Sequence, residues 1–246
     1  SNLKSVTRGF LKRAKKRKLI EWSPEMLFQD IDTSDANFKR VIREDDEEVF
    51  VDDELPIVLE YLENNLDLKN IGILLMFITG VRVGELVTLK HSDFEGNTVK
   101  IRRTETRVRV KKGKYEYNIK EFPKSKAGVR TVIIPKDFTW VVQRIAQINP
   151  NEEYVFVTAG ERMTTNCIRR RMTRMCKKLG IKQKSPHKAR RTYASILCDN
   201  DIDERLITDV MGHTDIQCTE NYYHKNRKDI NKKLKIISQI PEFRAQ

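Results

Sequence analysis

Residues 70–79 restrict the possible folds more than any other stretch of this 246-residue chain. They read N-I-G-I-L-L-M-F-I-T and are apolar on nearly every side, so a helix here must be enclosed by other elements. Gly80 follows directly and is placed to end the helix in a left-handed turn. The sequence therefore predicts a domain packed around one fully buried helix.

The neighbouring segments predict what encloses this helix. Apolar residues recur at helical spacing over residues 54–63, 135–148, 164–179 and 203–211. Between Asn97 and Pro135 the period changes to two, which indicates an antiparallel sheet of three or so short strands with turns at 112–114 and 126–128. Residues 154–157 add one short buried strand. The predicted fold class is mainly α with a small antiparallel β-sheet (α+β).

The first 45 residues are expected to stand apart from this domain. A basic amphipathic stretch at 8–20, R-G-F-L-K-R-A-K-K-R-K-L-I, predicts a single helix within residues 3–31. Acidic residues then crowd positions 44–54, where they could hold a cation such as Mg²⁺ but suit a helix start better. We therefore interpret 44–53 as a linker whose Asp52 or Asp53 caps the next helix, and place the main domain at 46–246.

Charge and composition indicate the class of partner. A formal net charge of +13 favours a polyanion, with nucleic acid as the first candidate. No run of about 18 apolar residues could span a bilayer, and no apolar signal segment opens the chain. The four cysteines lie far apart without a C-x-x-C pair, so neither a zinc site nor a disulfide framework is indicated. We expect a cytoplasmic, nucleoid-associated protein. Ser1-Asn2 without an initiator methionine reads as a cleavage scar, so we expect the natural protein to begin earlier.

Basic residues concentrate on the N-terminal helix, on one face of the predicted sheet and between Arg162 and Arg191. Each could be a DNA surface or simply a solvated face. The last segment holds twelve lysines and arginines and no acidic residue, whereas a solvated helix normally mixes the two signs. The residues predicted to contact DNA are Lys12, Arg13, Lys16, Arg103, Lys124, Arg169, Arg170, Arg174, Lys188 and Arg191.

Residues 185–224 concentrate groups that can hold a phosphate, move a proton or act as a nucleophile. They include three of the four histidines, a pair of arginines and a tandem tyrosine. His187 and Arg190 share one face of a helix that Pro186 opens. Each element has an ordinary alternative: a chance surface pair, Glu85 merely pairing with Arg82, or a tyrosine hydrogen-bonded in the core. The full set, in chain order, is Arg82, Lys126, His187, Arg190, His213 and Tyr222.

With these residues in place, the chain resembles the catalytic domain of the tyrosine recombinases, or phage-type integrases, of the conjugative-transposon or phage branch. The motifs that carry the resemblance are T-G-V-R-V-G-E-L at 79–86, S-K-A-G-V-R-T at 125–131, P-H-K-A-R-R-T at 186–192, M-G-H-T-D-I at 211–216 and T-E-N-Y-Y-H at 219–224. They span roughly residues 45–230. The resemblance implies the family's catalytic-domain fold, and it makes residues 1–45 the remnant of a helical core-binding domain.

The resemblance also implies the role of each residue. Arg82 and Arg190 grip the scissile phosphate, and Lys126 protonates the leaving 5′-oxygen. His187 assists proton transfer, and His213 hydrogen-bonds the phosphate. Tyr222 attacks the phosphorus to give a 3′-phosphotyrosyl link. Tyr222 is preferred to Tyr223 because its nine-residue interval from His213 matches the family pattern, and adjacent helical residues point about 100° apart. Neither a metal, nor ATP, nor another cofactor is implied.

The expected function is site-specific DNA recombination by the integrase or transposase of a mobile element of bacterial or phage origin. The alternatives are a type IB topoisomerase or telomere-resolvase-like strand transferase, and a non-catalytic DNA-binding protein. Expected partners are double-stranded DNA and further copies of the chain, as a dimer or tetramer on DNA, together with accessory directionality or host DNA-bending factors. A C-terminal helix at about 226–240 is expected to dock either in cis or in trans.

Overall fold

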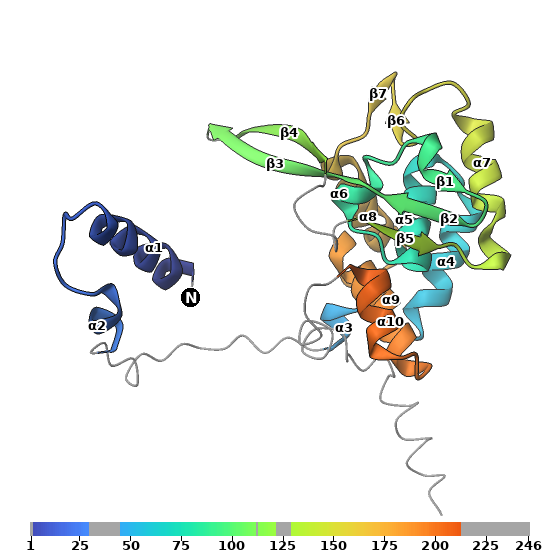
Figure 1. Cartoon of the computed structure of the whole chain (residues 1–246). Coiled ribbons are helices and arrows are strands. Elements are labelled where there is room, and N and C mark those ends of the chain that lie inside the picture. The colour runs from blue at the N-terminus through green and yellow to red at the C-terminus, as the bar shows by residue number, and fades with distance from the viewer. Residues whose placement is uncertain (1, 30–44, 112, 122–128, 213–246) are drawn as a thin grey trace, which may run out of the picture. The chain divides into compact units, whose positions relative to one another are not determined.

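The computed structural model describes residues 2–29, 45–111, 113–121 and 129–212. The chain forms two compact units, Ser1–Ile42 and Arg43–Gln246 (Figure 1). The expected C-terminal helix at 226–240 lies outside the described residues, as does the expected turn at 126–128. Within the described ranges, no helix has the length and apolar character needed to cross a membrane.

Residues 2–29, the described part of the first unit, form two helices, α1 (Asn2–Lys16) and α2 (Pro24–Gln29), where the sequence predicted one. Helix α1 ends because Lys18 adopts a left-handed conformation with φ 58°. Pro24 then opens α2, since proline suits the first turn of a helix. The Glu25 carboxylate lies 3.5 Å from an Arg8 guanidinium nitrogen and 3.3 Å from Lys12 Nζ, which links the two helices.

The second unit is built around α5 (Leu68–Thr79), whose residues other than Lys69 are all buried, as predicted. Asp67 caps its start by accepting hydrogen bonds from two backbone N–H groups, and Gly80, with φ 67°, ends it. The helices that pack against α5 include α4 (Glu54–Asn64), α7 (Trp140–Ile148), α8 (Thr165–Lys178) and α9 (Pro186–Asp199). Helix α10 (Glu204–Met211) packs against α9 (Figure 1).

The strands form separate sheets and not the single sheet that the sequence predicted. Strands β1 (Phe94–Glu95), β2 (Thr98–Ile101) and β5 (Arg130–Ile133) form one antiparallel sheet in the order β1-β2-β5. Strands β3 (Arg103–Lys111) and β4 (Lys114–Glu121) form a hairpin of their own. The cause is burial: β2 rests on the core through Val99 and Ile101, whereas β3 is exposed from Arg107 onward. Figure 1 shows the hairpin projecting away from the rest of the unit.

Short elements complete the second unit. The predicted strand at 154–157 is reduced to one β-bridge, between Tyr154 and Lys90, followed by the small hairpin of β6 (Val157–Thr158) and β7 (Glu161–Arg162). Among the described residues, the remaining elements are α3 (Asp45–Glu48), α6 (Val83–Leu86), and the 3-10 helices η1 (His91–Asp93) and η3 (Lys136–Phe138).

The acidic segment at 44–53 was wrongly predicted to be a linker, because its described residues belong to the second unit. Val49 and Phe50 are fully buried, and the Phe50 N–H donates to Thr192 Oγ1 at 2.8 Å. Asp53 stands at the start of α4 but makes no capping hydrogen bond with its side chain. The acids instead pair with lysines and arginines at 182–191, including Asp46 with Lys182 at 2.5 Å. Among the described residues, no group of three His, Cys, Asp or Glu side chains is arranged to hold a metal ion.

Candidate active site

Helix α9 brings His187 and Arg190 to one pocket. Pro186 occupies the first turn, and the spacing of three places both side chains on the same side of the helix. The Arg190 residue is 1% exposed, and its Nη1 donates to Gly80 O at 2.5 Å. Its Nη2 donates to Met211 O. The end of the buried helix α5 and the end of α10 therefore fix the position of Arg190.

Arg82 reaches the same pocket from the turn that follows Gly80. Its backbone N–H donates to Glu85 Oε2 at 2.8 Å, and its Nη1 donates to Glu85 Oε1 at 2.9 Å. A third hydrogen bond runs from Nη2 to Gly212 O at 3.2 Å. The Arg82 side chain nevertheless remains 41% exposed. Glu85 is thus the partner of Arg82, and it orients a guanidinium that solvent or a ligand can still reach.

Arg130 is the residue at this site that sequence reasoning missed. It lies on β5, and its Nη1 and Nη2 donate to the two Glu85 oxygens at 2.9 and 2.7 Å. Its Nε donates to Val210 O at 2.9 Å. A signal was present, because period-two alternation places Arg130 on the same buried face as Val132. Arg130 was not singled out because all lysines and arginines of the predicted sheet were assigned to its basic, outer face.

Two titratable groups at the site have shifted pKa values. Burial alone raises the pKa of Glu85, but the hydrogen bonds and charge of Arg130 and the charges of Arg82 and Arg190 outweigh it and lower the pKa to about 2. For His187, burial lowers the pKa, and the charges of Arg190, Arg82 and Lys188 lower it further. Glu85 is therefore ionised and His187 is neutral at pH 7, so the imidazole can accept a proton.

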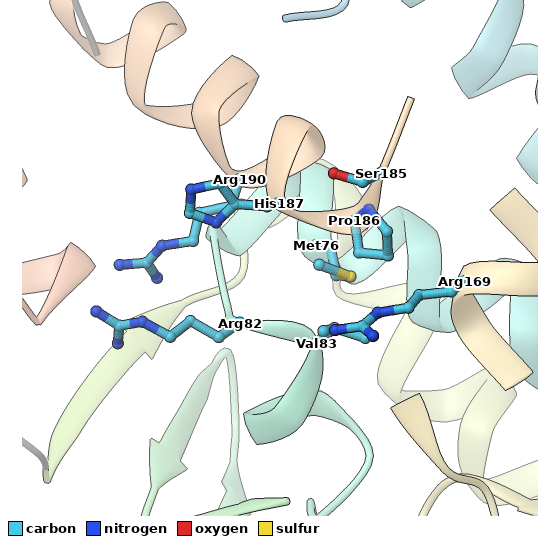
Figure 2. A pocket seen from close by; sticks show the side chains of 8 residues that line it. All are labelled: Met76, Arg82, Val83, Arg169, Ser185, Pro186, His187 and Arg190. Atoms are coloured by element: carbon cyan, nitrogen blue, oxygen red, sulfur yellow. The ribbon is translucent and has the colours of Figure 1, made fainter. Parts of the chain in front are cut away.

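The pocket has a volume of about 560 Å³. Figure 2 shows the guanidinium groups of Arg82 and Arg190 on one side of it, with the His187 ring beside Arg190, and Arg169 of α8 on the other side. The full lining is Met76, Arg82, Val83, Arg169, Ser185, Pro186, His187 and Arg190. The three arginines that line this cavity suit an anionic ligand such as a phosphodiester.

The structure thus brings together Arg82, His187 and Arg190. The other predicted catalytic residues lie outside the described residues: Lys126, His213 and Tyr222. Gly212, the residue before His213, is described and accepts the hydrogen bond from Arg82. The roles assigned to these six residues stay predictions.

The predicted DNA contacts fall into two groups. Arg169, Arg170 and Arg174 are exposed on α8, and none of them has an acidic partner among the described residues. By contrast, Arg103 pairs with Asp93, and Lys188 and Arg191 pair with Glu48. The acid-free stretch at 162–191 is therefore balanced in part by acids from distant segments, which its local composition could not indicate.

The remaining predicted contacts lie on α1 or outside the described residues. Lys12, Arg13 and Lys16 are exposed on α1, where Lys12 pairs with Glu25. Lys124 lies outside the described residues. All ten stay predictions as DNA contacts.

Comparison with known proteins places this domain among the tyrosine recombinases. The tyrosine recombinase XerD of Chlamydia muridarum is 29% identical over 159 residues, covering 64% of this chain and 48% of that protein. A probable integrase/recombinase of Acholeplasma phage L2 is 26% identical over 190 residues, covering 74% of this chain and 59% of the phage protein. The Phage integrase family model matches residues 48–229, and the chain belongs to this family.

Solved structures agree on the fold. The Tn1549 transposon integrase in complex with transposon right end DNA superimposes with a TM-score of 0.74 at 19% identity, covering 97% of this chain and 78% of that one. A lambda integrase dimer bound to a COC′ core site gives a TM-score of 0.60 at 16% identity, with coverage of 92% and 72%. The expected mainly α fold of a tyrosine recombinase catalytic domain is confirmed. The chain spans about half the length of the curated relatives it matches, from 48% to 53% for the first three.

Proposed function

We propose that this chain is the catalytic part of a site-specific DNA recombinase, the integrase or transposase of a mobile element. The observation that carries the proposal is the convergence of Arg82, Arg190 and His187 on one pocket (Figure 2). Family membership supports it, and the named relatives favour recombination over a topoisomerase or a non-catalytic DNA-binding protein.

The two arginines supply the electrostatic part of the reaction. Negative charge grows on the non-bridging oxygens as the phosphorus becomes five-coordinate, and fixed guanidinium groups stabilise that charge. Arg82 is suited to this role because Glu85 holds it while part of its side chain stays exposed. His187, neutral at pH 7, is suited to take or return a proton.

The motif assignments complete the proposed reaction. The Tyr222 oxygen attacks the phosphorus, so a phosphorus–tyrosine bond forms as the bond to the 5′-oxygen breaks. Lys126 gives that oxygen its proton, and the phenol proton passes to a neighbouring base. Reversal with another 5′-hydroxyl rejoins the strand without ATP, because the covalent link keeps the bond energy.

The proposed substrate is double-stranded DNA in the bacterial nucleoid. The exposed arginines of α8 support it, and solved neighbours of the same fold are complexes with DNA. We propose that several copies assemble on the DNA as a dimer or tetramer, and that residues 226–240 contribute to this assembly in cis or in trans.

Covalent trapping tests the proposal. The protein is incubated with nicked duplexes made from the DNA at the ends of the element that encodes it, so that a strand released by cleavage cannot rejoin. We expect a protein–DNA adduct that survives denaturation and is lost in Tyr222→Phe. An adduct that persists in Tyr222→Phe but is lost in Tyr223→Phe would reassign the nucleophile. The absence of any adduct with the unaltered protein would refute the proposed function.

A further inference from the structure

Three arginines from three separate segments of the chain converge on the end of α10. Arg130 donates to Val210 O at 2.9 Å, Arg190 donates to Met211 O, and Arg82 donates to Gly212 O at 3.2 Å. The last carbonyls of a helix have no partner within the helix and form its negative end, so cationic donors suit them. Two of these arginines belong to the proposed catalytic set, whereas Arg130 does not.

Arg130 is held in one orientation by all of its contacts. Its side chain is 5% exposed, and both terminal nitrogens bond the Glu85 carboxylate while Nε bonds Val210 O. A planar guanidinium matches a carboxylate in this two-point manner, which an ammonium group does not. The guanidinium group of Arg130 therefore connects Glu85 of α6 to the end of α10 and holds the two in a fixed arrangement.

The Glu85 carboxylate is shared between Arg130 and Arg82. It is 1% exposed, and its two oxygens accept four hydrogen bonds, two from each arginine. If Arg130 were absent, this buried negative charge would face Arg82 as its remaining charged hydrogen-bond partner. The attraction would draw the Arg82 guanidinium toward Glu85 and leave less of its positive charge for a phosphate.

Gly212 adds a steric link to the same group. It has φ 61°, and a Cβ atom at this position would lie 2.8 Å from Arg130 Cδ and 3.1 Å from its Nε. The main chain therefore runs directly against Arg130 at the residue that precedes His213. A change in the position of Arg130 would move this turn.

We propose that Arg130 is a positioning residue for DNA cleavage. It neutralises Glu85 so that Arg82 remains available to the phosphate, and it fixes the turn that leads to His213. This inference rests on the proposed function, because its effect is measured through cleavage.

Single-turnover cleavage of the nicked duplexes tests the role of Arg130. We expect Arg130→Met to lower the cleavage rate by about 100-fold, since small displacements of a catalytic group have effects of this order. Arg130→Lys keeps the charge but not the two-point geometry, so we expect a loss of about 10-fold. This second variant also remains informative if Arg130→Met does not fold.

Arg162→Met is the matched control. Arg162 is also mostly buried, its Nη1 lies 2.6 Å from Glu105 Oε2, and it donates to Val87 O and Met163 O. Its carboxylate partner does not bond Arg82, so we expect less than about a threefold change in cleavage rate after thermal unfolding has shown that the variant is folded at the assay temperature.

A substrate with a neutral methylphosphonate at the scissile position distinguishes positioning from a general loss of structure. If Arg130 acts through the charge that Arg82 offers to the phosphate, the loss in Arg130→Met should fall from about 100-fold to about 10-fold or less on this substrate, and the loss in Arg130→Lys should largely disappear. An equal loss on both substrates, or Arg130 variants that cleave as Arg162→Met does, would overturn the inference. If the unaltered protein forms no adduct on either substrate, the proposed function fails and this inference fails with it.

Discussion

Lys184 and Glu54 form an ion pair inside the second unit although 130 positions separate them. Lys184 Nζ lies 2.6 Å from both carboxylate oxygens, and its side chain is fully buried. The same ammonium group lies 5.1 Å from the centre of the Phe50 ring. This pair fastens the loop before α9 to the start of α4, and so supports the helix that carries His187 and Arg190.

Removing the lysine should therefore destabilise the protein strongly. We expect Lys184→Met to lower the free energy of unfolding by about 3–5 kcal/mol, because it leaves a carboxylate without its buried partner. Urea unfolding followed by circular dichroism measures the change. Lys182→Met is the control: its pair with Asp46 is exposed, so the expected loss is about 1 kcal/mol or less. Equal effects of the two substitutions would contradict this account.

His187 should titrate below its ordinary pKa of 6.5. Burial and the charges of Arg190 and Arg82 favour the neutral ring, so the folded protein holds its proton only at lower pH than a free histidine does. Removing one charge with Arg82→Gln should raise this pKa, whereas Arg144→Gln on α7 should leave it unchanged. Imidazole chemical shifts measured by NMR across pH 4–9 report both values. A pKa at or above 6.5 in the unaltered protein would contradict the prediction.

Two glycines with positive φ should respond differently to alanine. At Gly96 an added Cβ meets nothing within 4 Å, so Gly96→Ala should cost only the backbone strain of about 1–2 kcal/mol. At Gly80 the Cβ would lie 2.4 Å from Tyr193 Cδ1, so Gly80→Ala must also displace a packed ring. Thermal unfolding should show the larger loss for Gly80→Ala. Because Gly80 O also receives a hydrogen bond from Arg190, cleavage should fall in this variant and not in Gly96→Ala.

The exposed arginines of α8 should account for part of the salt dependence of DNA binding. Each of Arg170→Gln and Arg174→Gln should weaken binding to any duplex and reduce the slope of log K against log salt by about 1, as the loss of one phosphate contact does. Arg171→Gln on the same helix is the control, because Arg171 pairs with Asp67. Fluorescence anisotropy titrations at several salt concentrations measure these slopes. Slopes that stay unchanged in Arg170→Gln and Arg174→Gln would show that α8 does not face DNA.

Local spacing was enough to predict much of the fold. A stretch that is apolar on nearly every side must be buried, so residues 70–79 were enough to predict the buried helix α5. Gly80, the next residue, was enough to predict where that helix ends. The spacing of three between His187 and Arg190 likewise placed both side chains on one face. The pairing of Arg82 with Glu85 could be predicted for the same reason, because the two residues are only three positions apart in the sequence.

Features that depend on distant residues could not be predicted in this way. The pairing of Glu48 with Lys188 and Arg191 joins an acidic stretch to a basic one, and each looked like solvent-facing or DNA-facing charge when read alone. In the sequence Arg130 looks like the other basic residues of the sheet, because its partner Glu85 lies 45 positions away. The separation of β3 and β4 from β2 depends on where the core ends, which strand periodicity does not record.

The hydrogen bonds at the end of α10 determine which side chains there can change. The three arginines bond the main-chain oxygens of residues 210–212, so the identities of the first two side chains do not enter these contacts. Another apolar residue of similar size can replace Met211 and leave all three hydrogen bonds in place. Gly212 has no such freedom, because any side chain there meets Arg130. Evolution can therefore alter the residues before Gly212 and still retain the geometry at that end of the helix.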